Sequence, residues 1–276
     1  MTFPPSKQSI RMIFLFIFMI ALLRYSFHLC NRKIETLLVE ISADKNNLCR
    51  STSSYENYYD ADYFKWQIEH QEFQANHADP TRWGRVQPNF TVLEIGCSSG
   101  AVLHRLRCAQ KWCIEINSYA RKYAHEKYHL KTFRCLGELP NNSIDYAYSV
   151  SVLEHVETPI LLLRELYVKM KHKGVVEIQV KNEGRQSASN YSALQQWSQK
   201  KQDINNHLYT WTPLLLGNLI EGAGFRITRI ISKIAAFPPN YVKVRSEMNN
   251  EQWAQLLEEE GIKQGVESLT AYAEKK

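Results

Sequence analysis

The segment that most constrains this chain is Thr91–Val102, which reads TVLEIGCSSGAV. Three apolar residues surround Glu94, as is typical of a buried strand in a parallel sheet. A turn with glycines at 96 and 100 follows, and then helix-forming residues. Glycine lets the backbone bend sharply and lets a ligand approach with no Cβ in the way. The segment therefore predicts a strand that ends in a ligand-binding turn at the start of a helix.

A second acid, Glu115, follows the next apolar run, about 20 residues after the turn, the distance typical of nucleoside binding. Ser118 is the predicted N-cap of the helix that comes next. A carboxylate at this place can accept both hydroxyls of a ribose. The turn has the spacing G-x-x-x-G and lacks the dinucleotide pattern G-x-G-x-x-G. We therefore expect a cofactor that contains a nucleoside but no pyrophosphate.

Strand and helix patterns alternate from Thr91 to Val180, which predicts a parallel sheet with helices on both faces. Two helices are expected over Thr158–Lys173 and Thr212–Glu221 from their prolines and apolar spacing. Arg226–Ile234 and Val266–Ala273 alternate like the arms of an antiparallel hairpin. A further helix is expected within Ala193–Lys200, in an otherwise polar loop.

The ordered motifs resemble those of class I S-adenosylmethionine-dependent methyltransferases, in the branch that acts on small molecules. Glu94–Gly100 resembles the first motif of this family, and Glu115 its ribose-binding acid. Four later segments are similar in the same order: Ser143–Ser149, Val152–Val156, Lys173–Val180 and Gly222–Phe225. The resemblance implies an α/β fold: a Rossmann-like, doubly wound, seven-stranded, mostly parallel sheet with a terminal antiparallel hairpin, in three α/β/α layers.

The resemblance also implies S-adenosylmethionine as the cofactor. Glu94 is expected to anchor the turn or the methionine amino group, or else to cap backbone amides. The adenine is expected near Cys135–Leu139, where Glu138 stands close to the position at which the family often has an acid. The expected cofactor-binding residues are Glu94, Gly96, Cys97, Ser98, Gly100, Glu115, Ile116, Glu138, Leu139 and Ser149.

The methyl acceptor should enter at the carboxyl ends of the fourth and fifth strands. The expected catalytic residues are Glu154, His155 and His207, with Asn182 and Glu183 as further candidates. His207 is the first choice for a general base because histidine accepts a proton near neutral pH. The alternative is that each histidine only holds its loop by hydrogen bonds.

No metal site is expected at the pair Glu154 and His155. Quinone-type O-methyltransferases resemble this segment but have a third ligand, a glutamate, where this chain has Ser151. Without it, the pair offers Mg²⁺ too few of the oxygen ligands that this ion prefers.

The expected acceptor is a small molecule with a reactive oxygen or nitrogen, such as a sugar or a lipid-linked group. The alternatives are a methyltransferase acting on a macromolecule such as a protein, and a non-catalytic module that binds the cofactor. The net charge is +6, but the basic residues are scattered, so we expect no nucleic-acid partner. We expect a monomer. The six cysteines lack a C-x-x-C spacing and are expected to be buried free thiols.

The N-terminal region, residues 1–33, is expected to be a hydrophobic anchor. Met12–Leu23 is twelve unbroken apolar residues, preceded by Lys7 and Arg11. We predict a single-pass anchor at an endomembrane, with a cleaved signal peptide as the alternative. The flanking basic residues only slightly favour a cytosolic catalytic domain. Residues 34–54 are expected to form a polar stalk, and residues 55–276 the methyltransferase domain.

The methyltransferase domain is expected to begin with an aromatic-rich helical segment, Tyr55–His77, which could serve either as a lid over the acceptor or in ordinary packing.

Overall fold

The computed structural model describes residues 61–76, 84–182 and 207–276, which all belong to one compact unit, Cys49–Lys276. The predicted anchor and stalk lie outside the described residues, as do Glu183 and the helix expected within 193–200. Of the helices that the structure describes, none has the length and apolar character needed to cross a bilayer.

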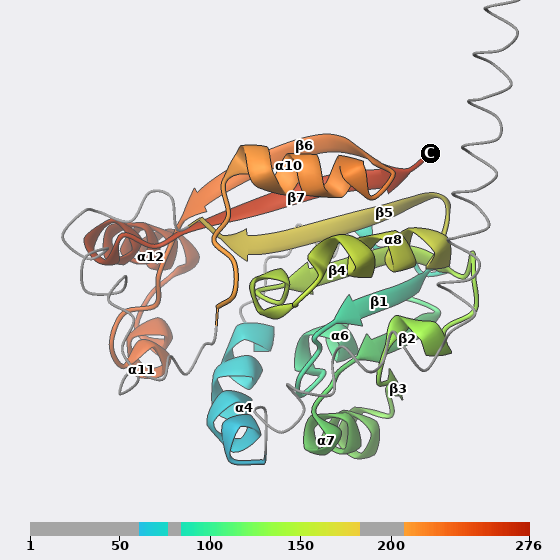
Figure 1. Ribbon diagram of the computed structural model, residues 1–276. Helices are drawn as coiled ribbons and strands as arrows, with labels where there is room; N and C mark the ends of the chain where they lie inside the picture. Colours follow the sequence, from blue (N-terminus) through green and yellow to red (C-terminus); the bar gives the residue numbers. More distant parts are fainter. Residues whose placement is uncertain (1–60, 77–83, 183–206) are drawn as a thin grey trace, which may run out of the picture. The chain divides into compact units, whose positions relative to one another are not determined.

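A seven-stranded sheet lies at the centre of this unit, with the strand order β3-β2-β1-β4-β5-β7-β6 (Figure 1). The first five strands in the chain pair in parallel, and β7 pairs antiparallel with both β5 and β6. The strands are β1 (Thr91–Ile95), β2 (Gln110–Ile114), β3 (Lys131–Phe133), β4 (Ile144–Val150), β5 (Met170–Lys181), β6 (Phe225–Ile234) and β7 (Glu267–Lys275). The predicted mostly parallel sheet with a terminal antiparallel pair is confirmed.

The helices lie between and beside these strands (Figure 1). They are α4 (Ala61–Asn76), α6 (Ala101–Arg105), α7 (Ser118–Tyr128), α8 (Pro159–Lys169), α10 (Pro213–Gly222), α11 (Tyr241–Ser246) and α12 (Asn250–Gln264), with 3-10 turns η1 (Leu136–Glu138) and η2 (Leu153–His155). Helices α11 and α12 lie in the connection between β6 and β7, the two arms of the predicted hairpin.

Alternate residues of β1 belong to two different cores, because successive side chains of a strand point to opposite faces. Leu93 packs in one core with Leu163 of α8 and Leu216 of α10. Val92 packs in the other with Leu103 of α6. Helices therefore cover both faces of the sheet, as the three-layer prediction requires.

Two predicted helix boundaries are wrong. The N-cap of α7 is Asn117, whose side chain accepts from the backbone amides of Tyr119 (2.9 Å) and Ala120 (3.2 Å), so Ser118 is already helical. Helix α8 ends at Lys169, and the chain enters β5 at Met170. The predicted Thr212–Glu221 helix is confirmed as α10, with Thr212 as its N-cap.

Candidate active site

The turn between β1 and α6, residues 96–100, is called the glycine turn below. Gly96 and Gly100 have φ angles of 72° and 76°, in the left-handed region, and Ser98 has a φ of 44°. The backbone amides of Gly96 and Cys97 both donate to the carbonyl oxygen of Ile114, at 2.7 and 3.3 Å. The turn is thus fixed against the end of β2.

The glycines also make room for the chain's own side chains. A Cβ on Gly96 would lie 2.4 Å from Cγ2 of Val152, and one on Gly100 would lie 2.4 Å from Cδ1 of Leu130. At both positions the close approach is therefore made by the protein, and L side chains would be strained there in any case. Val152 follows β4, at whose carboxyl end the methyl acceptor is expected to enter. The glycine turn therefore packs directly against the start of that segment.

Glu115 joins the glycine turn to the start of α7. Its two carboxylate oxygens accept hydrogen bonds from the backbone amides of Ser98 and Asn117, each at 2.9 Å. The side chain is buried, and burial raises the pKa of Glu115, while those two amides and the guanidinium of Arg121 lower it in part. The backbone amide of Ile116 also bonds to this carboxylate, which has about four acceptor positions, so some capacity remains for a ribose.

Cys97 and Cys113 form a disulfide, and Cys135 is also disulfide-bonded, so the expectation of free thiols is wrong for these three cysteines. Cys113 lies opposite Glu94 in the pairing of β1 with β2, and the glycine turn folds back over the end of β2. The Cα atoms are 5.7 Å apart, within the usual range for a disulfide. The sequence spacing gave no sign of this pair, because it forms only when two parallel strands lie side by side. Cys108 is a free, partly buried thiol.

Glu94 bonds to the neighbouring strand. The hydroxyl of Tyr148 on β4 donates to Oε2 of Glu94 at 2.8 Å, and both side chains are buried. Glu94 and Tyr148 are also register partners in the β1–β4 pairing. This bond fixes the carboxylate one residue before Ile95, where β1 ends and the glycine turn begins.

The residues expected around the adenine lie on η1 and β4. Glu138 is exposed and accepts from the backbone amide of Arg134 at 3.3 Å, so it closes its own turn. Leu139 is buried beside it. Ile116 follows β2, and its carbonyl oxygen accepts from Arg121 at 2.7 Å. Ser149 is buried on β4, beside Ile95 in the register.

Helix α4 supplies two contacts to the glycine turn that the sequence did not predict. The hydroxyl of Ser98 donates to Oε1 of Gln67 at 3.2 Å, and that of Ser99 to Oε1 of Gln71 at 3.5 Å. The two glutamines are one helical turn apart, so they lie on one face of α4. The aromatic-rich segment therefore contacts the cofactor side through its polar residues. Its role as a lid over the acceptor stays a prediction.

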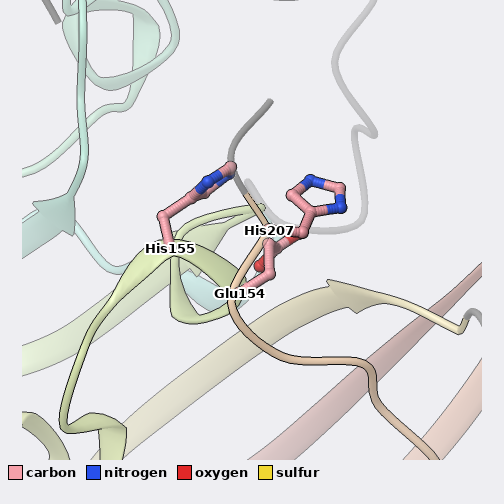
Figure 2. A group of neighbouring side chains, drawn as sticks. All are labelled: Glu154, His155 and His207. Carbon is pink, nitrogen blue, oxygen red and sulfur yellow. The ribbon is translucent and has the colours of Figure 1, made fainter. Parts of the chain in front are cut away.

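The three predicted catalytic side chains lie together, and Figure 2 shows them gathered from two segments of the chain. Glu154, His155 and His207 are called the histidine cluster below. Their ligand atoms all lie within 4.8 Å of one another. Ser151, with a φ of 52°, turns the chain out of β4 into η2, which carries the first two members. Asn182 is buried, and its backbone amide donates to the backbone carbonyl oxygen of Glu267, at 2.7 Å.

The backbone holds His207 beside η2. The amides of Leu208 and Tyr209 donate to the carbonyl oxygen of Glu154, at 2.7 and 3.3 Å. The Tyr209 hydroxyl donates to the carbonyl oxygen of Glu157 at 2.6 Å. The rings of His155 and His207 meet with centroids 4.9 Å apart.

These residues fit a nucleoside cofactor. Ser149 has no exposed surface, and in the described part of the chain its hydroxyl finds no hydrogen-bond partner. A buried polar atom of this kind marks a place where a ligand group can bond. Glu115 keeps acceptor capacity at the end of β2, which lies on the other side of β1 from Ser149. Ser149 lies at the carboxyl end of β4 and Glu115 at that of β2, on either side of β1, and ligands of such sheets bind at this edge.

Sheet topology, glycine turn and strand-end acid together define a class I S-adenosylmethionine-dependent methyltransferase. A family model described as a methyltransferase domain matches residues 24–230, and the chain belongs to that family. No protein with a curated description matches the chain significantly.

Solved structures share the fold at low identity. A SAM-dependent methyltransferase from Archaeoglobus fulgidus is 19% identical, with a TM-score of 0.51, over 77% of this chain and 99% of that one. A SAM-dependent methyltransferase from Thermotoga maritima is 16% identical, with a TM-score of 0.53, over 80% and 98%. A phosphoethanolamine N-methyltransferase from Haemonchus contortus, in complex with S-adenosylhomocysteine, is 16% identical, with a TM-score of 0.50, over 72% of this chain and 52% of that one. The cofactor is S-adenosylmethionine.

Proposed function

We propose that this enzyme methylates an oxygen or nitrogen atom of a small-molecule acceptor at the histidine cluster. The observation that carries the proposal is the contact between Gly96 and Val152. It puts the glycine turn, which faces the cofactor, against the segment that reaches Glu154 two residues later. Glu154 is only 1% exposed, so the reacting group must enter a buried place. A small acceptor can do so more readily than the surface of a folded macromolecule.

The cofactor supplies an activated methyl group on a sulfonium, so the protein mainly has to place the two reactants in line. Glu115 would bind the ribose hydroxyls, and the Ser149 hydroxyl would bond a polar group of the nucleoside. Glu154, His155 and His207 would contact the acceptor's reacting atom and assist its loss of a proton. Ser98, held by Gln67, would keep the glycine turn in its binding shape.

Calorimetric titration with S-adenosylmethionine and a methyl-transfer assay test this proposal together. We expect a dissociation constant for S-adenosylmethionine below about 1 mM, which is the upper end of the usual range of KM values. Release of S-adenosylhomocysteine is then followed with paired hydroxyl and amine compounds that share a carbon skeleton. Absence of cofactor binding would refute the proposal. Labelled methyl groups found only in protein would favour the macromolecular alternative, and binding without any turnover would favour the non-catalytic one.

We also propose that the chain is held at an endomembrane by Met12–Leu23. The family match begins at Arg24, directly after this apolar run, which supports a role for the run other than catalysis. The flanking charges favour a cytosolic domain, whereas the Cys97–Cys113 disulfide favours the lumen, because disulfides persist in oxidising compartments.

Glycosylation in cells decides the side of the membrane. The sequons at Asn89 and Asn141 are both exposed. A mobility shift on glycosidase treatment that is lost in an Asn89→Gln, Asn141→Gln variant places the domain in the lumen. Absence of the shift places it in the cytosol. Release of the intact chain from membranes by alkaline carbonate, without detergent, would refute the anchor.

A further inference from the structure

The histidine cluster has the donor atoms of a metal site. It brings two imidazoles and one carboxylate to within 4.8 Å of one another. In the tetrahedral geometry of zinc, metal–ligand bonds of about 2.1 Å put two ligand atoms about 3.4 Å apart. The ligand atoms therefore have to move closer when an ion binds, and the two partly exposed histidine rings are the side chains that have room to turn. Glu154 is buried, so its carboxylate has less room to move than the two rings.

Backbone hydrogen bonds bring the two segments of the cluster together. His155 and Glu154 are consecutive in η2, and His207 is brought to them by the amide bonds from Leu208 and Tyr209 to the Glu154 carbonyl. Residues 52 positions apart are thus fixed at one strand end. A site whose ligand residues are held by backbone hydrogen bonds is pre-organised. Less conformational entropy is then lost when an ion binds.

The donor set selects the class of ion. Mg²⁺ prefers oxygen ligands, and one carboxylate does not supply them. Two imidazoles and one carboxylate are a usual set for zinc in sites that keep one position open. Borderline divalent ions of this kind also favour imidazole nitrogen over water. The third ligand is His207. Quinone-type enzymes have a glutamate where this chain has Ser151, and that residue would have given a site richer in oxygen ligands.

We propose that Glu154, His155 and His207 bind one divalent ion of the zinc class, which holds the acceptor's hydroxyl in its open position. This inference rests on the proposed function and narrows its acceptor to a hydroxyl compound. The bound ion lowers the pKa of the hydroxyl, whose proton passes to water. The oxygen then takes the methyl group as the sulfur–carbon bond breaks, leaving neutral S-adenosylhomocysteine. In this arrangement His207 is a ligand and does not act as the general base that the sequence predicted.

Metal binding is measured on the full chain after treatment with EDTA. We expect one equivalent of Zn²⁺ by calorimetry, and with Co²⁺ as a probe we expect visible absorption of the intensity typical of four- or five-coordinate sites. Glu154→Gln and His207→Asn, which keep size and polarity, should each weaken binding at least tenfold. His172→Asn is the matched control, because His172 is an exposed histidine on β5, away from the cluster in sequence.

The outcomes separate this inference from the proposed function. Cofactor binding without stoichiometric Zn²⁺ or Co²⁺ binding would overturn the metal site and leave the methyltransferase assignment intact. Loss of ion binding in the His172 variant, or its retention in both cluster variants, would also overturn the site. Absence of cofactor binding would refute the proposed function whatever the ion does. Zn²⁺-stimulated turnover of a hydroxyl compound, but not of its paired amine, is the expected final result.

Discussion

Replacing Glu115 with alanine should damage both the glycine turn and cofactor binding. The carboxylate accepts one amide from Ser98 and one from Asn117, each at 2.9 Å. An amide that loses its buried partner costs about 1–3 kcal/mol, and some of this is recovered by relaxation. We therefore expect the free energy of unfolding to fall by about 2–4 kcal/mol.

The same substitution removes the proposed partner of the ribose hydroxyls. Loss of a hydrogen bond to a charged group weakens binding by about 1–3 kcal/mol. This corresponds to a rise in the dissociation constant for S-adenosylmethionine of about 5- to 150-fold. Glu115→Gln keeps one acceptor oxygen but turns an NH₂ group toward an amide donor. It should therefore lose less stability than alanine while still binding the cofactor weakly.

Calorimetric titration and urea unfolding measure the two effects separately. Glu260→Ala is the matched control, because Glu260 is also 9% exposed but lies on α12, outside the site. It should leave the dissociation constant unchanged. An unchanged dissociation constant in the folded Glu115→Ala protein would refute the ribose contact and leave Glu115 only the task of organising the turn.

Three further predictions concern the turn, the disulfide and a buried acid. Gly96→Ala should cost at least ~1–2 kcal/mol of stability and impair cofactor binding, because its φ is 72°; Gly84→Ala, whose Cβ would meet nothing within 4 Å, should change neither quantity. Replacing Cys97 and Cys113 together with alanine should lower the free energy of unfolding in urea by about 3 kcal/mol, since the bond closes a loop of 16 residues; equal stability would show that the pair is not bonded in solution. Burial raises the pKa of Glu165 to about 7. Between about pH 4.5 and pH 7 the folded chain thus keeps a proton that the unfolded chain loses. The free energy of unfolding should therefore fall as the pH rises through this range. In the Glu165→Gln variant, this fall should be smaller by up to roughly 3 kcal/mol.

The cofactor half of the site was predictable because its signals are local in the sequence. An apolar run, two glycines and a strand-end acid each depend on a few neighbouring residues, and β1, the glycine turn and Glu115 lie where those signals put them. The terminal antiparallel pair was found in the same way, from its alternating pattern. Parallel pairing then follows from the order of strands and helices.

The wrong boundary of α8 shows where local signals conflict. Apolar spacing continues to Met170, which a helix and a strand would bury equally well. The decision is made by pairing with a distant strand, because Met170 is the register partner of Ile144 on β4. The amide of Ser143 also bonds to the carbonyl oxygen of Lys169, at 2.9 Å, which ends the helix there. The last four residues of the predicted helix, 170–173, therefore belong to β5.

The acceptor half of the site depends on contacts that no local pattern contains. The pair Glu154 and His155 alone suggested an incomplete magnesium site, because the sequence offers no third oxygen ligand at Ser151. His207 was a separate candidate from the sequence, and the structure brings it to the pair through two backbone hydrogen bonds to the Glu154 carbonyl oxygen, which gives a set of two imidazoles and one carboxylate. The glycine turn and Glu115, in contrast, lie within one strand–helix–strand unit, so the signals for both are close together in the sequence. A motif can therefore identify the cofactor of such an enzyme, whereas the chemistry of its acceptor is decided by which distant segment the fold brings to the end of β4.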